Sequence, residues 1–287
     1  MTEARIHDAG YRRYTGVRLG PSQAIRSLTR HTAQRVMGLR RPARYKALPF
    51  LVVLIAYLPA AVFVGLAAFL PHQLRGQLPK VSDYYGFVTA AIVLFVAFVA
   101  PESMCPDRKY RTLSLYLAAP LDRLSYLRAK AQAVVAILAL VTVGPPVLML
   151  IGLSLQNAGP KHPSDLAIVV VRILASGTML AVFYTSISMA VASLTDRRAF
   201  AAAFTLILVA GSVTVAGTLV YALGATHSLV VLNLSRVPFE MSQRIFGTYD
   251  NDLRGVPTVV IVLGTVGWFA LGCAVTWWRY RRLQVTR

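Results

Sequence analysis

Hydroxyl side chains are concentrated in one apolar segment of the sequence, which runs from Ile173 to Leu194. A serine or threonine acts as a nucleophile when a general base lies within hydrogen-bonding reach of its hydroxyl group. None of the five histidines falls in this segment or in another long apolar segment. Hydroxyls in apolar helices more often bond the helix backbone or a neighbouring helix. Catalysis is therefore the least favoured hypothesis for these residues, which are Ser176, Thr178, Thr185, Ser186 and Ser188.

The sequence also lacks the common motifs that bind nucleotides and metals. It contains no G-x-x-x-x-G-K-[ST] loop, no H-E-x-x-H, no C-x-x-C and no G-x-S-x-G. Its two cysteines, Cys105 and Cys273, are far apart and indicate neither a disulfide framework nor a metal site. We therefore expect no catalytic residue, no metal and no cofactor in this chain, and no hydrolysis of ATP by the chain alone.

The amino-acid composition indicates a membrane protein, so the helices that would position any site are expected to cross the membrane. Of the 287 residues, 56% are hydrophobic and 14% are charged, with a mean hydropathy of +0.58. A helix of roughly 20 apolar residues crosses a bilayer core about 30 Å thick with its backbone groups bonded internally. We therefore predict an all-α membrane protein with six transmembrane helices. The six segments without Lys, Arg, Asp or Glu are Leu48–Leu70, Tyr84–Pro101, Ala131–Leu155, Ile173–Leu194, Ala199–Leu223 and Val256–Trp278.

Three features refine this prediction. The third segment contains Gly144-Pro145-Pro146, which removes two backbone donors and predicts a kink. The fourth is preceded by an apolar run that stops at Arg172, so we expect the span to begin at Ile173. Glu102 follows the second segment directly, and we expect it to be an ordinary surface acid rather than a proton relay.

Basic residues dominate the charge, with 30 Lys and Arg against 11 Asp and Glu and a net charge of +19. Most of them lie before the first segment, between the second and third, between the fourth and fifth, and after the sixth. Basic residues in short loops are retained on the cytoplasmic side. Their positions therefore indicate topology rather than nucleic-acid binding, and predict a cell-membrane protein with both termini in the cytoplasm. The first 47 residues lack the apolar stretch of a signal peptide, so we expect the amino terminus to be retained.

The chain divides into a cytoplasmic amino-terminal segment (1–47), a six-helix membrane domain (48–278) and a basic cytoplasmic tail (279–287). Residues 224–255 are too apolar for a solvated loop and too polar to span, so we expect an outer interfacial or re-entrant helical segment between the fifth and sixth helices. The amino-terminal segment predicts an amphipathic helix on the membrane surface, beginning at Pro21. Its apolar stripe consists of Ile25, Leu28, Thr32, Val36 and Leu39.

The apolar segments contain no side chain that could couple an ion gradient to movement of a solute. Secondary transporters use ionisable side chains at membrane depth, and all six segments lack them. If the chain transports a substrate, we expect another subunit to supply the energy.

This organisation resembles the permease subunits of type-2 ATP-binding-cassette exporters. The shared features are the six helices with cytoplasmic ends, the preceding amphipathic helix, the charged loop after the second helix and the apolar outer connection before the sixth. The run from Asp107 to Leu117 is similar to the family's charged cluster, Gly-Thr-Leu and helix pattern, although Arg111 stands where a glycine usually precedes the threonine. Residues 8–20 also look like the start of actinobacterial members. The remaining matching positions are Pro120, Arg123, Tyr126 and Lys130.

The resemblance implies a half-transporter that exports an amphiphilic or hydrophobic substrate, such as a drug, lipid or glycolipid. Two copies, or this chain and a similar permease, would assemble among membrane lipids with separate ATPase subunits that bind ATP and Mg. The pathway would lie between the second and fifth helices of the two halves, with candidate residues Thr89, Phe95, Phe98, Ser212, Thr214 and Thr218. The candidates for coupling to the ATPase are Asp107, Arg108, Arg111, Thr112, Leu113 and Leu117. The alternatives are a membrane scaffold or lipid-binding subunit without a pathway and, less favoured, an intramembrane enzyme.

Overall fold

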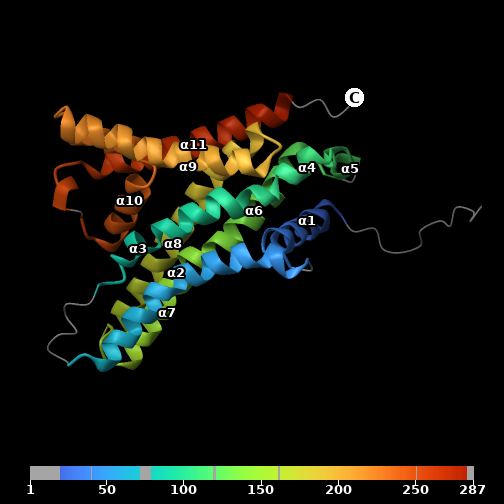
Figure 1. Ribbon diagram of the computed structural model, residues 1–287. Coiled ribbons are helices and arrows are strands. Elements are labelled where there is room, and N and C mark those ends of the chain that lie inside the picture. Colours follow the sequence, from blue (N-terminus) through green and yellow to red (C-terminus); the bar gives the residue numbers. More distant parts are fainter. Residues whose placement is uncertain are drawn as a thin grey trace, which may run out of the picture.

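The computed structural model describes residues 20–39, 41–71, 79–118, 121–160, 162–249 and 251–282. Within these ranges all regular structure is helical (Figure 1). Six helices are long and apolar enough to cross a membrane, which confirms the predicted helical class and the number of candidate spans. Residues 1–19, which carry part of the family resemblance, and residues 283–287 of the basic tail lie outside the described ranges, as does the side chain of Leu117.

The six candidate spans contain the six predicted apolar segments almost completely, and most extend further at their charged ends. The first is α2 (Ala43–Phe69). The second runs from Tyr84 to Lys109 through α3 (Tyr84–Leu94), the π-helical turn η2 (Phe95–Val99), the 3-10 turn η3 (Ala100–Ser103) and α4 (Cys105–Lys109). The third combines α6 (Arg123–Thr142) with α7 (Gly144–Leu155). The others are α8 (Pro163–Leu194), α9 (Arg198–Gly217) with the π-helical turn η4 (Thr218–Ala222), and α11 (Thr258–Arg282).

The third span is interrupted where the sequence predicts a kink. Helix α6 ends at Thr142 and α7 begins at Gly144, because the two prolines that follow supply no backbone N–H to continue the ladder. Helix α8 packs closely against this break: the Thr142 hydroxyl donates to the Gly177 carbonyl at 2.7 Å, and a Cβ at Gly177 would lie 2.4 Å from a methyl group of Val143. The break is therefore a packing site as well as an interruption.

The fourth span is one continuous helix, so the prediction that it begins at Ile173 is wrong. Helix α8 starts at Pro163 and passes through Arg172 without interruption. The guanidinium of Arg172 donates to the backbone carbonyl of Phe246 at 2.8 Å, so the charged group has a hydrogen-bond partner although it lies inside the helix. A contact distant in sequence thus overrides the local boundary signal.

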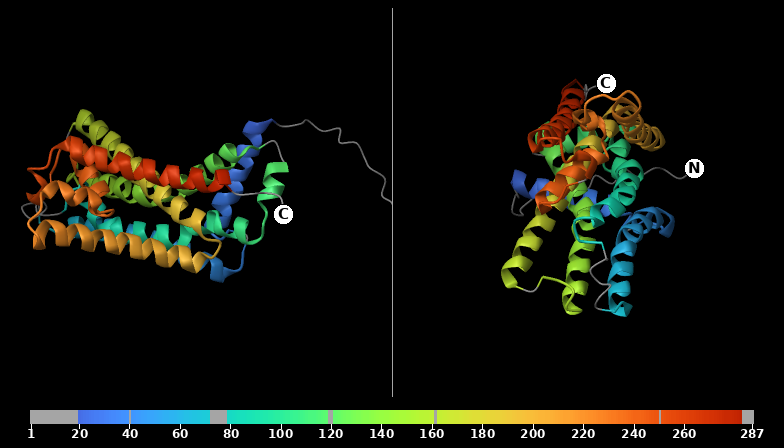
Figure 2. Two further views of the ribbon diagram at one scale, coloured as in Figure 1. Left: turned by 90° about the horizontal axis from the view of Figure 1, so that it is seen from above. Right: turned by 90° about the vertical axis from the view of Figure 1, so that its left-hand side faces the viewer.

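Helix α1 (Pro21–Val36) begins at the predicted residue and crosses the end of the long helices near α4 and α5 (Leu113–Ala118) (Figure 2). It packs against α6 and η3. Leu28, Thr32 and Val36 of the predicted stripe are buried there. The apolar face of α1 is therefore covered largely by protein, and its placement on a membrane surface stays a prediction.

The connection between the fifth and sixth spans contains η5 (His227–Leu232), α10 (Arg236–Phe246) and η6 (Asn251–Leu253). Helix α10 packs against α8, α11 and α3 at the end of the bundle opposite α1 (Figure 1). It begins where the Asn233 side-chain oxygen accepts the backbone N–H of Arg236 at 2.9 Å, and it ends at Gly247, whose positive φ of 76° suits glycine.

Candidate functional site

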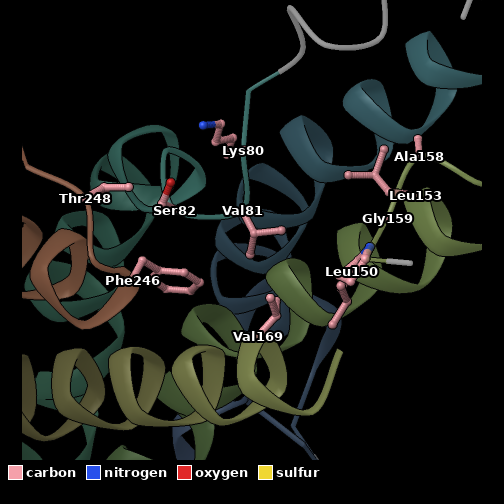
Figure 3. A pocket seen from close by; sticks show the side chains of 11 residues that line it. Lys80, Val81, Ser82, Leu150, Leu153, Ala158, Gly159, Val169, Phe246 and Thr248 are labelled. Carbon is pink, nitrogen blue, oxygen red and sulfur yellow. The ribbon is translucent and has the colours of Figure 1, made fainter. Parts of the chain in front are cut away.

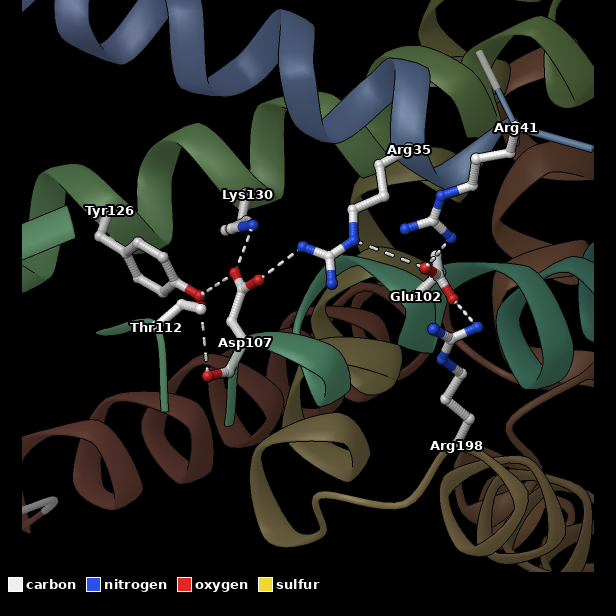
Figure 4. A network of polar contacts seen from close by, with 8 residues as sticks. All are labelled: Arg35, Arg41, Glu102, Asp107, Thr112, Tyr126, Lys130 and Arg198. Carbon is white, nitrogen blue, oxygen red and sulfur yellow. Dashed lines mark hydrogen bonds and ion pairs between the residues drawn. The ribbon is translucent and has the colours of Figure 1, made fainter. Parts of the chain in front are cut away.

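Two carboxylates, Glu102 and Asp107, lie at the end of the bundle crossed by α1 (Figure 4). Both belong to the second span, which changes there from a π-helical turn to a 3-10 turn and then to the short helix α4. Pro101 and Pro106 lie in the first turns of η3 and α4, where a missing N–H is tolerated. These irregular turns aim the two acids at α1, α6 and α9.

The carboxylate of Asp107 is 1% exposed and accepts contacts from three side chains. Lys130 lies 2.6 Å from Oδ2, and the Tyr126 hydroxyl donates to the same oxygen at 2.8 Å. Arg35 donates from Nη1 to Oδ1 at 2.6 Å. Tyr126 and Lys130 reach one carboxylate because residues four apart share one face of α6. Two cations, Arg35 and Lys130, therefore share the single carboxylate of Asp107.

The second carboxylate, Glu102, is also buried, so the expectation of an ordinary surface acid is wrong. It is 7% exposed and forms ion pairs with three guanidinium groups. Arg41 lies 2.8 Å from Oε1, Arg35 Nε lies 3.5 Å from the same oxygen, and Arg198 pairs with Oε2. Because Arg35 contacts both acids, the two groups form one network, which we call the charged cluster. It comprises Arg35, Arg41, Glu102, Asp107, Tyr126, Lys130 and Arg198.

The charged cluster keeps Arg35 ionised. Burial alone would lower the pKa of its guanidinium, but the charge and hydrogen bond of Asp107, together with Glu102, raise that pKa above the ordinary arginine value. Burial and the neighbouring negative charge of Asp107 also raise the pKa of Tyr116, so this phenol remains neutral. These contacts hold α1 to the second span by charge as well as by apolar packing.

Three of the predicted coupling residues, Arg108, Arg111 and Thr112, take part in local structure beside the charged cluster. The guanidinium of Arg108 donates to the backbone carbonyls of Ser193 and, at 3.3 Å, Thr195, which ties α4 to the end of α8. Thr112 donates its backbone N–H to the Asp107 carbonyl at 3.0 Å. Arg111 adopts a positive φ of 53°, a conformation that glycine adopts without strain. The turn therefore has a shape that glycine would adopt freely, although the residue here is arginine.

Helix α5 follows this turn directly and spans Leu113–Ala118. Its Leu113 and Tyr116 are half-buried and pack against the apolar residues beneath. Leu115 faces outward and is 72% exposed, and Tyr110 nearby is 66% exposed. Sequence reasoning missed Leu115 because a six-residue helix contains too few turns for its apolar spacing to identify the outer face.

The six predicted pathway residues do not line a single cavity. Phe95 is fully buried in η2, whereas Phe98 is 41% exposed and lines a cavity of about 130 Å³ beside Glu102 and Arg198. Thr89 lines a different cavity, of about 340 Å³, at the opposite end of the bundle. On α9, Ser212 is half-buried, and both Thr214 and Thr218 are exposed on the surface of the isolated chain. Within the chain, helix α9 packs against η2, so the second and fifth spans are neighbours.

A larger cavity of about 380 Å³ lies at the end away from the charged cluster, between α7, α8, α10 and residues 80–82, which precede α3 (Figure 3). Its walls are mainly apolar, with Leu150, Leu153, Val169 and Phe246 inside and Lys80 at its edge. Across the described ranges, no three His, Cys, Asp or Glu side chains lie close enough together to hold a metal ion.

Compared with known proteins, the chain matches no protein-family model and no curated sequence. Its fold and charged cluster define it as a helical protein with six candidate membrane spans, whose second span is joined by buried charges to three other parts of the chain.

Proposed function

We propose that this chain is the permease subunit of an ATP-driven exporter of amphiphilic or hydrophobic substrates. A separate ATPase subunit docks at the end of the bundle that carries the charged cluster. This end faces the cytoplasm of the cell, as do both termini, and α1 lies along the membrane surface there. The 224–255 connection then forms the outer interfacial segment.

The observation that carries this proposal is the buried connection from Asp107 to Arg35 and Lys130. Separating a buried charge from its partner costs about 3–5 kcal/mol, so these contacts resist being pulled apart. A displacement of α4 therefore moves α1 and α6 with it as one body. Through Glu102 and Arg198, the same displacement reaches α9. A push on one short cytoplasmic segment would thus be transmitted to the second, third and fifth spans.

The ATPase contacts and displaces α5 together with the turn before it. Leu115 and Tyr110 present apolar surface outside the bundle, beside the exposed cations Lys109 and Arg111. An apolar side chain on a short helix, surrounded by positive charge, fits a cleft that has an apolar floor and an acidic rim. Since all six apolar segments lack ionisable side chains, the energy source is a partner of this kind.

A second copy of the chain, or a similar permease, completes the proposed transporter. Exposed apolar side chains on the second and fifth spans offer a surface for it, among them Phe87, Phe98, Phe204, Ile207 and Val215. Gly211 and Gly217 on α9 have open space where a Cβ would lie, so a partner helix could approach closely.

The test measures ATP hydrolysis by the chain reconstituted in liposomes with ATP-binding-cassette ATPase subunits from the same genome. Replacing Leu115 with serine should remove the stimulation of hydrolysis that the wild-type permease gives. The matched control is Leu155→Ser, because Leu155 is also highly exposed (81%, against 72% for Leu115) but lies at the opposite end of the bundle. Wild-type stimulation by Leu115→Ser would contradict the proposed docking site. Absence of any association with an ATPase would favour the scaffold or lipid-binding alternative.

A further inference from the structure

Arg236 lies at the end of the bundle opposite the charged cluster and lines two adjoining cavities. One has a volume of about 340 Å³ and lies between α3, α9 and α10. The other has a volume of about 130 Å³ and lies between α9, η5 and the start of α10. Val213, Asn233 and Arg236 line both, so the arginine stands where they meet.

The lining of these cavities combines one positive charge with a mainly apolar wall. Among the described lining residues, Arg236 is the sole charged side chain. Asn233 and Ser235 contribute polar groups beside it, and Phe239 and Val220 contribute apolar surface. Such a lining matches a molecule with a negatively charged head and an apolar body.

The other arginine of α10 has a structural role, which sets Arg236 apart. Arg244 is 4% exposed and forms a buried ion pair with Glu240 at 2.9 Å. It also donates to Thr258 and to the Val256 carbonyl, each at 2.8 Å, and so fastens α10 to the start of α11. Replacing that arginine would disturb the fold.

Arg236, by contrast, is positioned to exchange its carboxylate partner for an incoming anion. Its side chain is 30% exposed, and its ion pair with Asp252 spans 3.2 Å to a carboxylate that is 58% exposed. An ion pair of this kind near the surface contributes little to stability, so replacing one anion by another is nearly neutral. The guanidinium group binds carboxylate and phosphate groups through paired hydrogen bonds.

We propose that these cavities bind the anionic head of an amphiphile through Arg236, with the adjoining apolar wall receiving the beginning of its tail. This inference rests on the proposed export function and names its substrate class, which is an acidic amphiphile. The head would meet Arg236 at the outer end of the second and fifth spans.

The test compares two fluorescent probes that share a tail and differ in the head: a dansyl-labelled fatty acid and the corresponding primary amide. Each is titrated against the purified chain in phosphatidylcholine nanodiscs, without an ATPase. The wild type should bind the acid about tenfold more tightly than the amide, the difference expected for one charge-assisted hydrogen bond. Arg236→Gln should abolish this preference, and Arg236→Lys should retain part of it.

Two further variants separate binding from folding. Arg254 is an exposed cation at the same end of the bundle and lines neither cavity. Arg254→Gln should therefore leave the preference for the acid unchanged. Asp252→Asn removes the competing carboxylate and should tighten binding of the acid. Equal binding of acid and amide by the wild type, or an unchanged preference in Arg236→Gln, would overturn the proposal. Displacement of the acid by butyrate as effectively as by the unlabelled fatty acid would show that the apolar wall takes no part.

Because no ATPase is present, this result is independent of the ATPase assay. A preference lost in Arg236→Gln, together with no stimulation of any ATPase, would establish the anionic site while rejecting the exporter. If ATP hydrolysis is stimulated in a way that depends on Leu115 but the chain shows no preference for the acid, the exporter proposal would be supported and this substrate class rejected.

Discussion

The ammonium group of Lys130 lies 2.6 Å from the carboxylate of Asp107, and each side chain is 1% exposed. Lys130 without Asp107 would be a buried charge without its partner, whereas Asp107 without Lys130 would still be paired with Arg35. Asp107 also accepts contacts from Arg35 and Tyr126. The carboxylate is therefore the centre of the charged cluster, and its loss should have larger consequences than the loss of any one partner.

Removing Asp107 should destabilise the protein more than removing Lys130. Asp107→Ala leaves two cations near an empty space and should cost about 3–5 kcal/mol. Lys130→Met preserves the volume and leaves the acid paired with Arg35, so it should cost less. The double variant should be little worse than Asp107→Ala, because the two residues share one interaction. Thermal unfolding in detergent, followed by size-exclusion fluorescence, measures this, and additive losses would contradict the coupling.

The stability that Arg35 contributes should be constant across neutral pH. Its pKa is raised above the ordinary arginine value by Asp107 and Glu102, against the opposing effect of burial. A cation with a raised pKa stabilises the fold fully below its unfolded pKa and loses that effect only as the pH rises through the folded pKa. The difference in unfolding temperature between the wild type and Arg35→Gln should therefore stay level between about pH 6 and about pH 9. A difference that shrinks steadily over this interval would show that another group controls the contact.

Gly177→Ala should destabilise the break between α6 and α7. The new methyl group would lie 2.4 Å from a Val143 methyl and 3.1 Å from the Thr142 carbonyl oxygen, so neighbouring helices must shift. Overpacking of this kind costs about 1–3 kcal/mol. The matched control is Gly267→Ala on α11, where nothing lies within 4 Å and the extra helix propensity should be neutral or slightly stabilising. Equal unfolding temperatures for the two variants would contradict this account of the packing.

The proposed orientation predicts which exposed positions a membrane-impermeant maleimide reaches in intact cells. In a background where Cys105 and Cys273 are replaced by serine, Arg254→Cys should be labelled from outside. Asp196→Cys should be labelled only after the membrane is permeabilised. Both positions are exposed and lie at opposite ends of the bundle, so exposure itself does not bias the comparison. Labelling in the reverse order would invert the topology.

Several parts of the fold could be predicted because their cause is local in sequence. A run of apolar residues long enough to cross a bilayer identifies each span by itself, and the prolines after Gly144 interrupt a helix wherever it lies. Helix α1 likewise begins at Pro21, the residue at which the sequence predicts a helix to start. The predicted boundary at Arg172 was wrong because a local rule expects a charged residue at a helix end. Arg172 instead lies inside α8, where its guanidinium donates to the backbone carbonyl of Phe246 in α10.

The sequence by itself determined the class of this protein, the six candidate spans and the absence of charged side chains from their apolar cores. The tertiary structure decided which charges meet. Arg35 and Asp107 are separated by 72 positions and belong to segments that share no periodicity. The sequence around Glu102 predicts a surface acid, whereas helix packing leaves Glu102 buried. The physical reason is that hydropathy acts through the residues next to one another along the chain, whereas a buried ion pair exists only after helix packing brings distant residues within 4 Å and excludes water around them.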